Sequence, residues 1–286
     1  MNFSFLSKEI PSAHAAALIL GGAAFLSKLL GLFRDRLLAS YFGAGDTLDI
    51  YYAAFQIPDL FHVLLLVGAA SAAVLPVFLE YERKSHEAAE RLVGNLIGIF
   101  ALVALALAVI AIAASPSLVP LIAPGFSAVK LAETVRLTRI IMLAAVFLGV
   151  AGILSSVLQA RHRFIAFALP PIVYNLGIIA GILFASRALG PMGLALGVFA
   201  GSIGQVLVAL VPLRSLGFRF RLGFRPLDPG IRQIVRVSLP RVAALGMSQV
   251  TLLVLIAIAS FFAAGSIAAF KLAANLLAVP VGLFGV

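Results

Sequence analysis

The heptapeptide "SYFGAGD" at residues 40–46 recurs as "SFFAAGS" at residues 260–266, an offset of 220 residues. Each copy ends one long apolar segment and starts the next, which then carries a proline, Pro58 in the first case and Pro280 in the second. Six apolar segments separate the copies. Because six is an even number, both units would have the same orientation in a membrane. Parallel repeats of this kind are typical of two-lobed transporters, in which the substrate passes between the lobes.

The composition identifies a membrane protein. The 286 residues are 63% hydrophobic and 11% charged, whereas soluble domains have about 25% charged residues. Crossing a hydrocarbon core takes roughly 20 apolar residues. Apolar segments of about this length or longer lie at 15–41, 48–79, 92–114, 135–158, 167–187, 192–213, 237–264 and 266–286. We therefore predict an all-α polytopic membrane protein with one six-helix transporter lobe and the first two helices of a second lobe.

This prediction divides the chain into four parts. They are a cytoplasmic segment at 1–14, the six-helix lobe at 15–213, a basic amphipathic cytoplasmic linker at 214–236, and two helices of an incomplete second lobe at 237–286. Alternating access requires two lobes that move against each other. We therefore expect that this chain cannot flip a lipid alone, and that the rest of the second lobe or a partner chain completes it.

Lys and Arg residues are concentrated in alternate connections. Eleven of them lie at 80–91, 159–164 and 214–236. Four lie in the other set of connections, at 43–46, 115–139, 187–191 and 263–266. Cytoplasmic loops carry the excess of Lys and Arg, and Lys8 belongs with the richer set, so we predict a cytoplasmic N-terminus. The basic stretch 219–240 is either an ordinary loop of this kind or an amphipathic segment that contacts anionic membrane lipids.

Several classes of function lack support in the sequence. The chain has no cysteine, and its four histidines are scattered without the spacing of metal ligands. No catalytic triad, paired catalytic carboxylates or phosphate-binding glycine loop occurs at a credible spacing. The net charge of +10 is explained by basic cytoplasmic loops. We therefore predict no enzyme, no metal or other cofactor, and no nucleic-acid partner.

The first apolar segment carries an unusual cluster of charges. Lys28, Arg34, Asp35 and Arg36 fall within nine residues, and Lys28 lies about 20 Å into the membrane at 1.5 Å per residue. Extension to the outer interface explains Arg36 and, less well, Arg34, but not Lys28. Charges at membrane depth usually face a cavity or a partner. Several cations and few acids predict an anionic amphiphile with a phosphate-bearing head group as the substrate.

Acidic residues follow in the second segment. We expect Asp49 to pair with Arg34 or Arg36 near the outer end, and Pro58 to kink the helix. Asp59 is expected to face the same cleft as Lys28, either as a partner that neutralises it or as a ligand contact. The isolated Gln159 and Asn175 are more typical of hydrogen bonds between helices.

The stretch "FLSKLLGLFRDRLLASYFGAGDTLDIYYAAFQIPDLF" at 25–61 resembles the start of the MurJ/MviN lipid II flippase family. The resemblance continues through "GAASAAVLPVFLEY" (68–81), "APGF" (123–126), "RFIAFALPPIVYNLGII" (163–179) and "SLPRVAALGMSQV" (238–250). The family belongs to the multidrug/oligosaccharidyl-lipid/polysaccharide exporter superfamily. The resemblance implies two helical lobes around a cationic cavity in the bacterial inner membrane. It also implies transport of a polyprenyl-diphosphate disaccharide-pentapeptide, and it marks this chain as divergent and apparently truncated.

Residue by residue, the resemblance implies both matches and departures. Arg34, Asp35 and Asp49 match the family pattern, and Lys28 stands where the family usually has an arginine. Asp59 replaces an asparagine, and His62 replaces a cavity arginine.

Two further departures follow. Val67 replaces a glutamate, and Asn275 stands at the position of an arginine in the second lobe. Lys271 precedes Asn275 by four residues, so the two share a helix face and Lys271 can supply the missing charge. The predicted substrate-binding residues are Lys28, Arg34, Asp49, Asp59, His62, Lys271 and Asn275.

The sequence thus predicts a flippase that moves the polyprenyl-diphosphate-linked peptidoglycan precursor, lipid II, by alternating access. Two alternatives remain open. One is a flippase for another polyprenyl-linked glycan. The other is a non-transporting pseudo-flippase or membrane scaffold.

Overall fold

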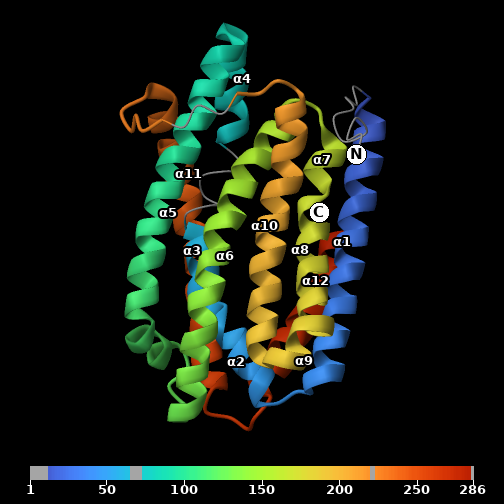
Figure 1. Ribbon diagram of the computed structural model, residues 1–286, viewed down its shortest axis with the longest axis vertical. Helices are drawn as coiled ribbons and strands as arrows, with labels where there is room; N and C mark the ends of the chain where they lie inside the picture. The colour runs from blue at the N-terminus through green and yellow to red at the C-terminus, as the bar shows by residue number, and fades with distance from the viewer. Residues whose placement is uncertain (1–11, 65–72, 220–222, 285–286) are drawn as a thin grey trace.

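The computed structural model describes residues 12–64, 73–219 and 223–284, and these residues form a helical bundle without strands (Figure 1). Five long continuous helices are α1 (Ala13–Phe42), α5 (His86–Ile122), α6 (Ala128–Ala160), α10 (Pro191–Ser215) and α11 (Pro229–Ala259). Together with the broken helix at Phe164–Leu189, the described chain has 6 helices long and apolar enough to span a membrane. The predicted all-α, polytopic membrane fold is confirmed.

The second predicted helix, 48–79, is not continuous. The structure has α2 (Asp46–Ala54), α3 (Gln56–His62) and α4 (Val74–Lys84), and residues 65–72 lie outside the description. Pro58 has no N–H to bond the carbonyl of Ala54, so the helix is interrupted there. The Thr138 hydroxyl of α6 donates to the Thr134 carbonyl at 2.8 Å and also lies 3.3 Å from the freed Ala54 carbonyl. The irregularity expected at Pro58 is thus a one-residue turn at Phe55, whose φ of −76° and ψ of −19° stay in the helical region.

The fifth span is segmented and lies very close to α10. It comprises α7 (Phe164–Ala168), α8 (Pro170–Ala180), the π-helical turn η3 (Gly181–Ala185) and α9 (Ser186–Leu189). A Cβ atom placed on Gly181 would lie 2.7 Å from the Cα of Gly197. Glycines at four-residue spacing on both helices allow this approach, as is common where membrane helices associate through close packing. These glycines bring α10 into close backbone contact with α8 and η3.

Two helices that follow the predicted first lobe in the sequence pack against it. α11 lies against α5 and α3, whereas α12 (Ser266–Phe284) lies against α2 and α1. Helix α10 continues to Ser215 and α11 already begins at Pro229, where Asp228 caps it. The irregular connection is thus shorter than the predicted linker 214–236, and Arg232 and Arg236 lie on α11. The assignment of α11 and α12 to a second lobe stays a prediction.

The bundle has two chemically different ends (Figure 1). At the lower end of this view the turns 43–45, 123–127 and 260–265 come together, and we call this the sealed end. A Cβ atom on Gly265, whose φ is +92°, would collide with the carbonyl oxygen of Ala44. The two copies of the sequence repeat therefore meet backbone to backbone. At the opposite, basic end, the connections 84–86, 161–163 and 216–228 carry most of the loop arginines and lysines.

Candidate functional site

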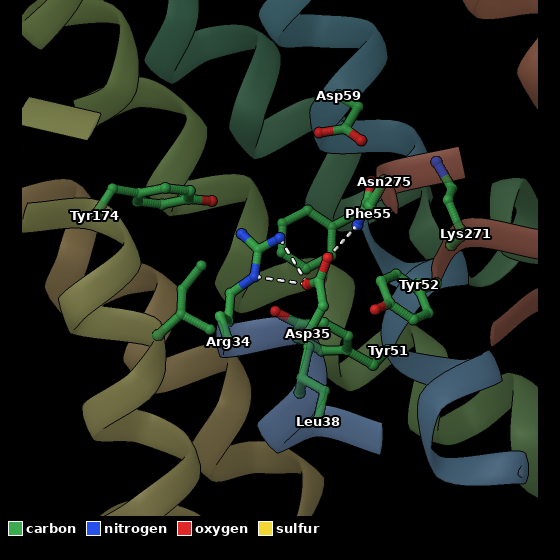
Figure 2. Close-up of a pocket in the computed structure, with 11 residues that line it drawn as sticks. Arg34, Asp35, Leu38, Tyr51, Tyr52, Phe55, Asp59, Tyr174, Lys271 and Asn275 are labelled. Carbon is green, nitrogen blue, oxygen red and sulfur yellow. Dashed lines mark hydrogen bonds and ion pairs between the residues drawn. The ribbon is translucent and has the colours of Figure 1, made fainter. Parts of the chain in front are cut away.

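A polar cavity of about 230 Å³ lies between α1, α2, α3, α8 and α12 (Figure 2). It contains two cations, Arg34 and Lys271, and two carboxylates, Asp35 and Asp59. The other lining residues are Leu38, Tyr51, Tyr52, Phe55, Tyr174, Ile178 and Asn275. Four of the predicted substrate-binding residues, Arg34, Asp59, Lys271 and Asn275, are thus brought together from both parts of the chain.

Arg34 is held in a network that joins three helices. Its guanidinium donates to the Asp35 carboxylate at 2.8 and 2.9 Å and to the Asn175 side-chain oxygen of α8 at 3.0 Å. The amide of Asn275 on α12 donates to the second Asp35 oxygen at 2.9 Å. Asp35 is buried, with 7% of its surface exposed, and a buried carboxylate needs such partners. Arg34 therefore points into the protein, which excludes extension to the outer interface, whereas Arg36 is exposed.

Asp59 and Lys271 form the less tightly bound half of the polar cavity. Both are half-buried and both lie above the Arg34–Asp35 pair in Figure 2. They interact electrostatically, but no ion pair of 4.0 Å or less joins them. The hydroxyl of Tyr52 in the same wall is buried without a hydrogen-bond partner. These groups have unused capacity for a ligand.

A second, larger cavity of about 750 Å³ lies toward the basic end. Its wall is mostly small and apolar, and its polar lining includes Lys28, Arg34, His62, Asn175 and Gln205. Arg34 and Tyr174 line both cavities. The two cavities therefore lie in series along α1, with Arg34 at their junction and the polar cavity nearer the sealed end.

Lys28 lies in the larger cavity, and the alternative that it pairs with Asp59 is wrong. The ammonium of Lys28 donates to the carbonyl of Ala278 on α12, at 3.5 Å, and Asp59 does not line this cavity. His62 does line it, and its Nδ1 atom is buried without a partner. Lys28, Arg34 and His62 thus share one space, whereas Asp59 shares its space with Lys271.

Asp49 does not pair with Arg34 or Arg36, so that expectation is wrong. Its carboxylate accepts hydrogen bonds from the backbone N–H groups of Gly265 and Ala268, at 2.7 and 2.8 Å. These groups belong to the start of α12, where the first N–H groups of a helix lack partners and the helix dipole favours a negative charge. Asp49 is 3% exposed and lines neither cavity. The structure therefore places it in the closure between the repeated turns.

Some residues were missed by sequence reasoning, and others cannot be tested. Asp35, which connects Arg34 to α12, was not among the predicted substrate-binding residues, although it matches the family motif and lies in the charged cluster of the first helix. Tyr52 and Tyr174 had no signal, because aromatic residues are common on any membrane helix. Asn175 makes the predicted contact between helices, since it also donates to Ser27 at 3.4 Å. Three residues on which the sequence predictions draw, Lys8, Val67 and Arg221, lie outside the described residues.

Comparison with known proteins identifies the family. The family model described as "Lipid II flippase MurJ" matches residues 38–286. The chain belongs to the MurJ lipid II flippase family. It is 31% identical over 275 residues to a probable lipid II flippase MurJ of Rhizobium tropici, covering 93% of this chain and 51% of the relative. It is also 31% identical over 282 residues to the lipid II flippase MurJ of Burkholderia cenocepacia, with coverages of 95% and 54%.

A solved member of the MurJ family has the same fold. The lipid II flippase MurJ in an inward closed conformation matches with a TM-score of 0.77 at 25% sequence identity, covering 94% of this chain and 56% of that one. The predicted resemblance to the MurJ family is thus confirmed. The chain spans about half the length of the curated relatives it matches.

Proposed function

We propose that this chain forms the substrate-binding half of a flippase that moves lipid II across the bacterial inner membrane by alternating access. The observation that carries the proposal is the series of cavities with Arg34 at their junction. It presents a cation at three successive positions, Lys28, Arg34 and Lys271, inside a membrane-spanning bundle. Arg34 already pairs with Asp35, but the described residues give Lys28 no carboxylate partner. A cation at this depth needs a compensating anion, and a diphosphate supplies one.

The larger cavity suits the remainder of such a substrate. Its volume of about 750 Å³ gives room for part of the sugar and peptide portions, and Asn175 and Gln205 offer them hydrogen-bonding groups while Lys28 and Arg34 bind the diphosphate. On the outer side of α1, Leu18, Phe25 and Leu29 are 78%, 47% and 44% exposed. This apolar face contacts lipid, so the polyprenyl chain can stay in the bilayer while the head group occupies the cavity.

The arrangement supports an inward-facing state. With the basic end in the cytoplasm, the larger cavity lies on the cytoplasmic side, and the packed turns of the sealed end close the opposite side. The N-terminus is then cytoplasmic. Transport would require Asp49 to release the start of α12, so that the two lobes separate at the sealed end. The division into a first lobe at 15–213, a cytoplasmic linker and a second lobe from 237 onward is part of this proposal.

The test is binding of lipid II to the purified protein in nanodiscs, measured by native mass spectrometry. We expect Arg34→Ala and Lys28→Ala to weaken binding at least tenfold, whereas Lys28→Arg retains it because the charge is kept. Arg36→Ala is the matched control, since Arg36 is on the same helix but exposed. Complementation by the whole protein that contains this chain should follow the same order.

Two results would contradict the proposal. Equal lipid II binding by the wild type, Arg34→Ala and Lys28→Ala would exclude a head-group site at these cations. Tighter binding of a different polyprenyl-diphosphate glycan, by tenfold or more, would assign the protein to that substrate instead of lipid II.

A further inference from the structure

We propose that Asp59 takes up one proton when the anionic head group reaches Lys271, so that substrate binding is coupled to proton binding inside the polar cavity. This inference rests on the proposed function and adds a coupling ion to it. The charged side chains of the cavity are Arg34, Asp35, Asp59 and Lys271, and they differ in how firmly their partners hold them.

The charges of Arg34 and Asp35 already compensate each other. They form an ion pair at 2.8 Å, and Asn175 and Asn275 add neutral hydrogen bonds to Arg34 and Asp35 respectively. Asp35 is therefore the more firmly bound of the two carboxylates that line the cavity.

Asp59 has a weaker set of partners. Among the described residues its carboxylate forms no ion pair. Its compensating charge is Lys271, which lines the same cavity from α12. Lys271 reaches the same space from α12 without a short contact to any carboxylate (Figure 2). The two groups are thus matched in charge but loosely joined, and a third charged group can enter between them.

A diphosphate that binds Lys271 changes the environment of Asp59 in two ways. It takes over the cation that compensates Asp59, and it places a second negative charge beside the carboxylate. A carboxylate that is removed from water and lies next to a like charge binds a proton instead of remaining ionised. The proton reaches Asp59 from the basic end through the larger cavity. One proton is bound to Asp59 for each head group that binds.

The other titratable groups around Asp59 do not replace it in this role. Tyr51, Tyr52 and Tyr174 line the cavity with uncharged phenol groups, and the hydroxyl of Tyr52 has no hydrogen-bond partner. His62 is one turn further along α3 and lines the adjoining cavities. It is the competing proton acceptor, so the experiment must separate His62 from Asp59.

Isothermal titration calorimetry provides the test, with the protein in nanodiscs and a water-soluble short-chain analogue of lipid II. The phosphates of this diphosphate diester keep their charge from mildly acidic to mildly basic pH, so they contribute no protons of their own. Titrations in two buffers with different ionisation enthalpies give the number of protons taken up per ligand. We expect about one for the wild type, with affinity that weakens up to about tenfold per pH unit as pH rises.

The variants decide which group binds the proton. Asp59→Asn should bind the analogue with no proton uptake and with an affinity independent of pH, whereas His62→Gln should still take up the proton. Asp46→Asn is the matched control, because Asp46 is exposed at the sealed end and pairs with Lys130. It should behave as the wild type.

The outcomes separate this inference from the function beneath it. Binding by the wild type without proton uptake, or uptake that is lost in His62→Gln and retained in Asp59→Asn, would overturn the role of Asp59 and leave the proposed function standing. Absence of binding by the wild type would instead overturn the proposed function, and this inference with it.

Discussion

The two ends of the bundle are joined across their helices by different means. At the sealed end, the backbone of Gly265 packs directly against that of Ala44. Two side chains accept backbone hydrogen bonds there: Asp49 accepts from the first N–H groups of α12, and the Ser260 hydroxyl accepts from the N–H of Gly125 at 2.9 Å. The two Asp49 hydrogen bonds are buried, and the bond between Gly125 and Ser260 is partly buried. A closure of this kind holds firmly, yet it can open as a unit once a small number of hydrogen bonds break.

At the basic end, the connection between α10 and α11 is bound onto the lobe instead. The Asn95 side chain accepts from the N–H of Arg225 at 2.6 Å and donates to its carbonyl at 2.9 Å, and Glu90 accepts from the N–H of Arg219 at 2.8 Å. The hydroxyl of Tyr81 accepts from the N–H of Gly230 at 2.9 Å and donates to the Asp228 carboxylate at 3.1 Å.

Tyr81 helps to hold the start of α11 in place. Burial raises the pKa of Tyr81, and the Asp228 carboxylate adds to the rise, so the phenol remains a donor at neutral pH. The start of α11 is therefore fixed to α4 and α5. In the proposed mechanism, α11 and α12 turn about the basic end while the sealed end separates.

The largest expected effect concerns which end faces the cytoplasm. The chain has no cysteine, so single cysteines can be introduced at Phe224 of the basic end and Val129 of the sealed end, which are 59% and 76% exposed. In intact cells, a membrane-impermeant thiol reagent should label Val129→Cys fully and Phe224→Cys not at all. The reverse pattern would invert the comparison and turn the inferred inward-facing state into an outward-facing one.

A smaller effect is expected when the closure itself is weakened. Asp49→Ala leaves two buried N–H groups of α12 without acceptors and removes a favourable charge at its start, which should lower the free energy of unfolding by about 2 kcal/mol. The midpoint of thermal unfolding in detergent measures the loss. A cysteine reporter at Leu38, which is buried beside the polar cavity, should become more accessible from the sealed side.

The neighbouring Asp46→Ala is the control for Asp49. Asp46 forms an exposed ion pair with Lys130, and such pairs contribute about 0–1 kcal/mol. Asp46→Ala should lower the unfolding midpoint much less than Asp49→Ala does, and it should leave the labelling of the Leu38 reporter unchanged. Equal effects of both substitutions would show that the sealed end is not held by Asp49 in particular.

The smallest effect is expected at the basic end. Asn95→Ala removes two hydrogen bonds to the backbone of Arg225, but water can partly replace them near the surface, so the expected loss is about 1 kcal/mol. Limited proteolysis should cut the connection 216–228 faster, while the Leu38 reporter stays as protected as in the wild type. If this substitution made the Leu38 reporter more accessible, the two ends would open as one cooperative unit. That result would contradict the view that separate contacts hold the two ends.

The sequence by itself determined the membrane fold and its repeat. Apolar length is a local property of each segment, and it predicts spanning helices because any membrane segment must satisfy its own backbone hydrogen bonds. The charged cluster from Lys28 to Arg36 likewise indicated a functional region, since charge at membrane depth is costly wherever the helix packs. The family motifs added Lys271 and Asn275, and the structure brings both to Arg34.

Only the tertiary structure decided which charge meets which. Asp49 and Asp59 are both acids on the second span, yet one closes the sealed end and the other faces Lys271 of α12, more than two hundred residues away. A one-residue turn at Phe55 separates the two acids between α2 and α3. Partners of this kind are set by the packing of distant helices, and no spacing along one helix records that packing.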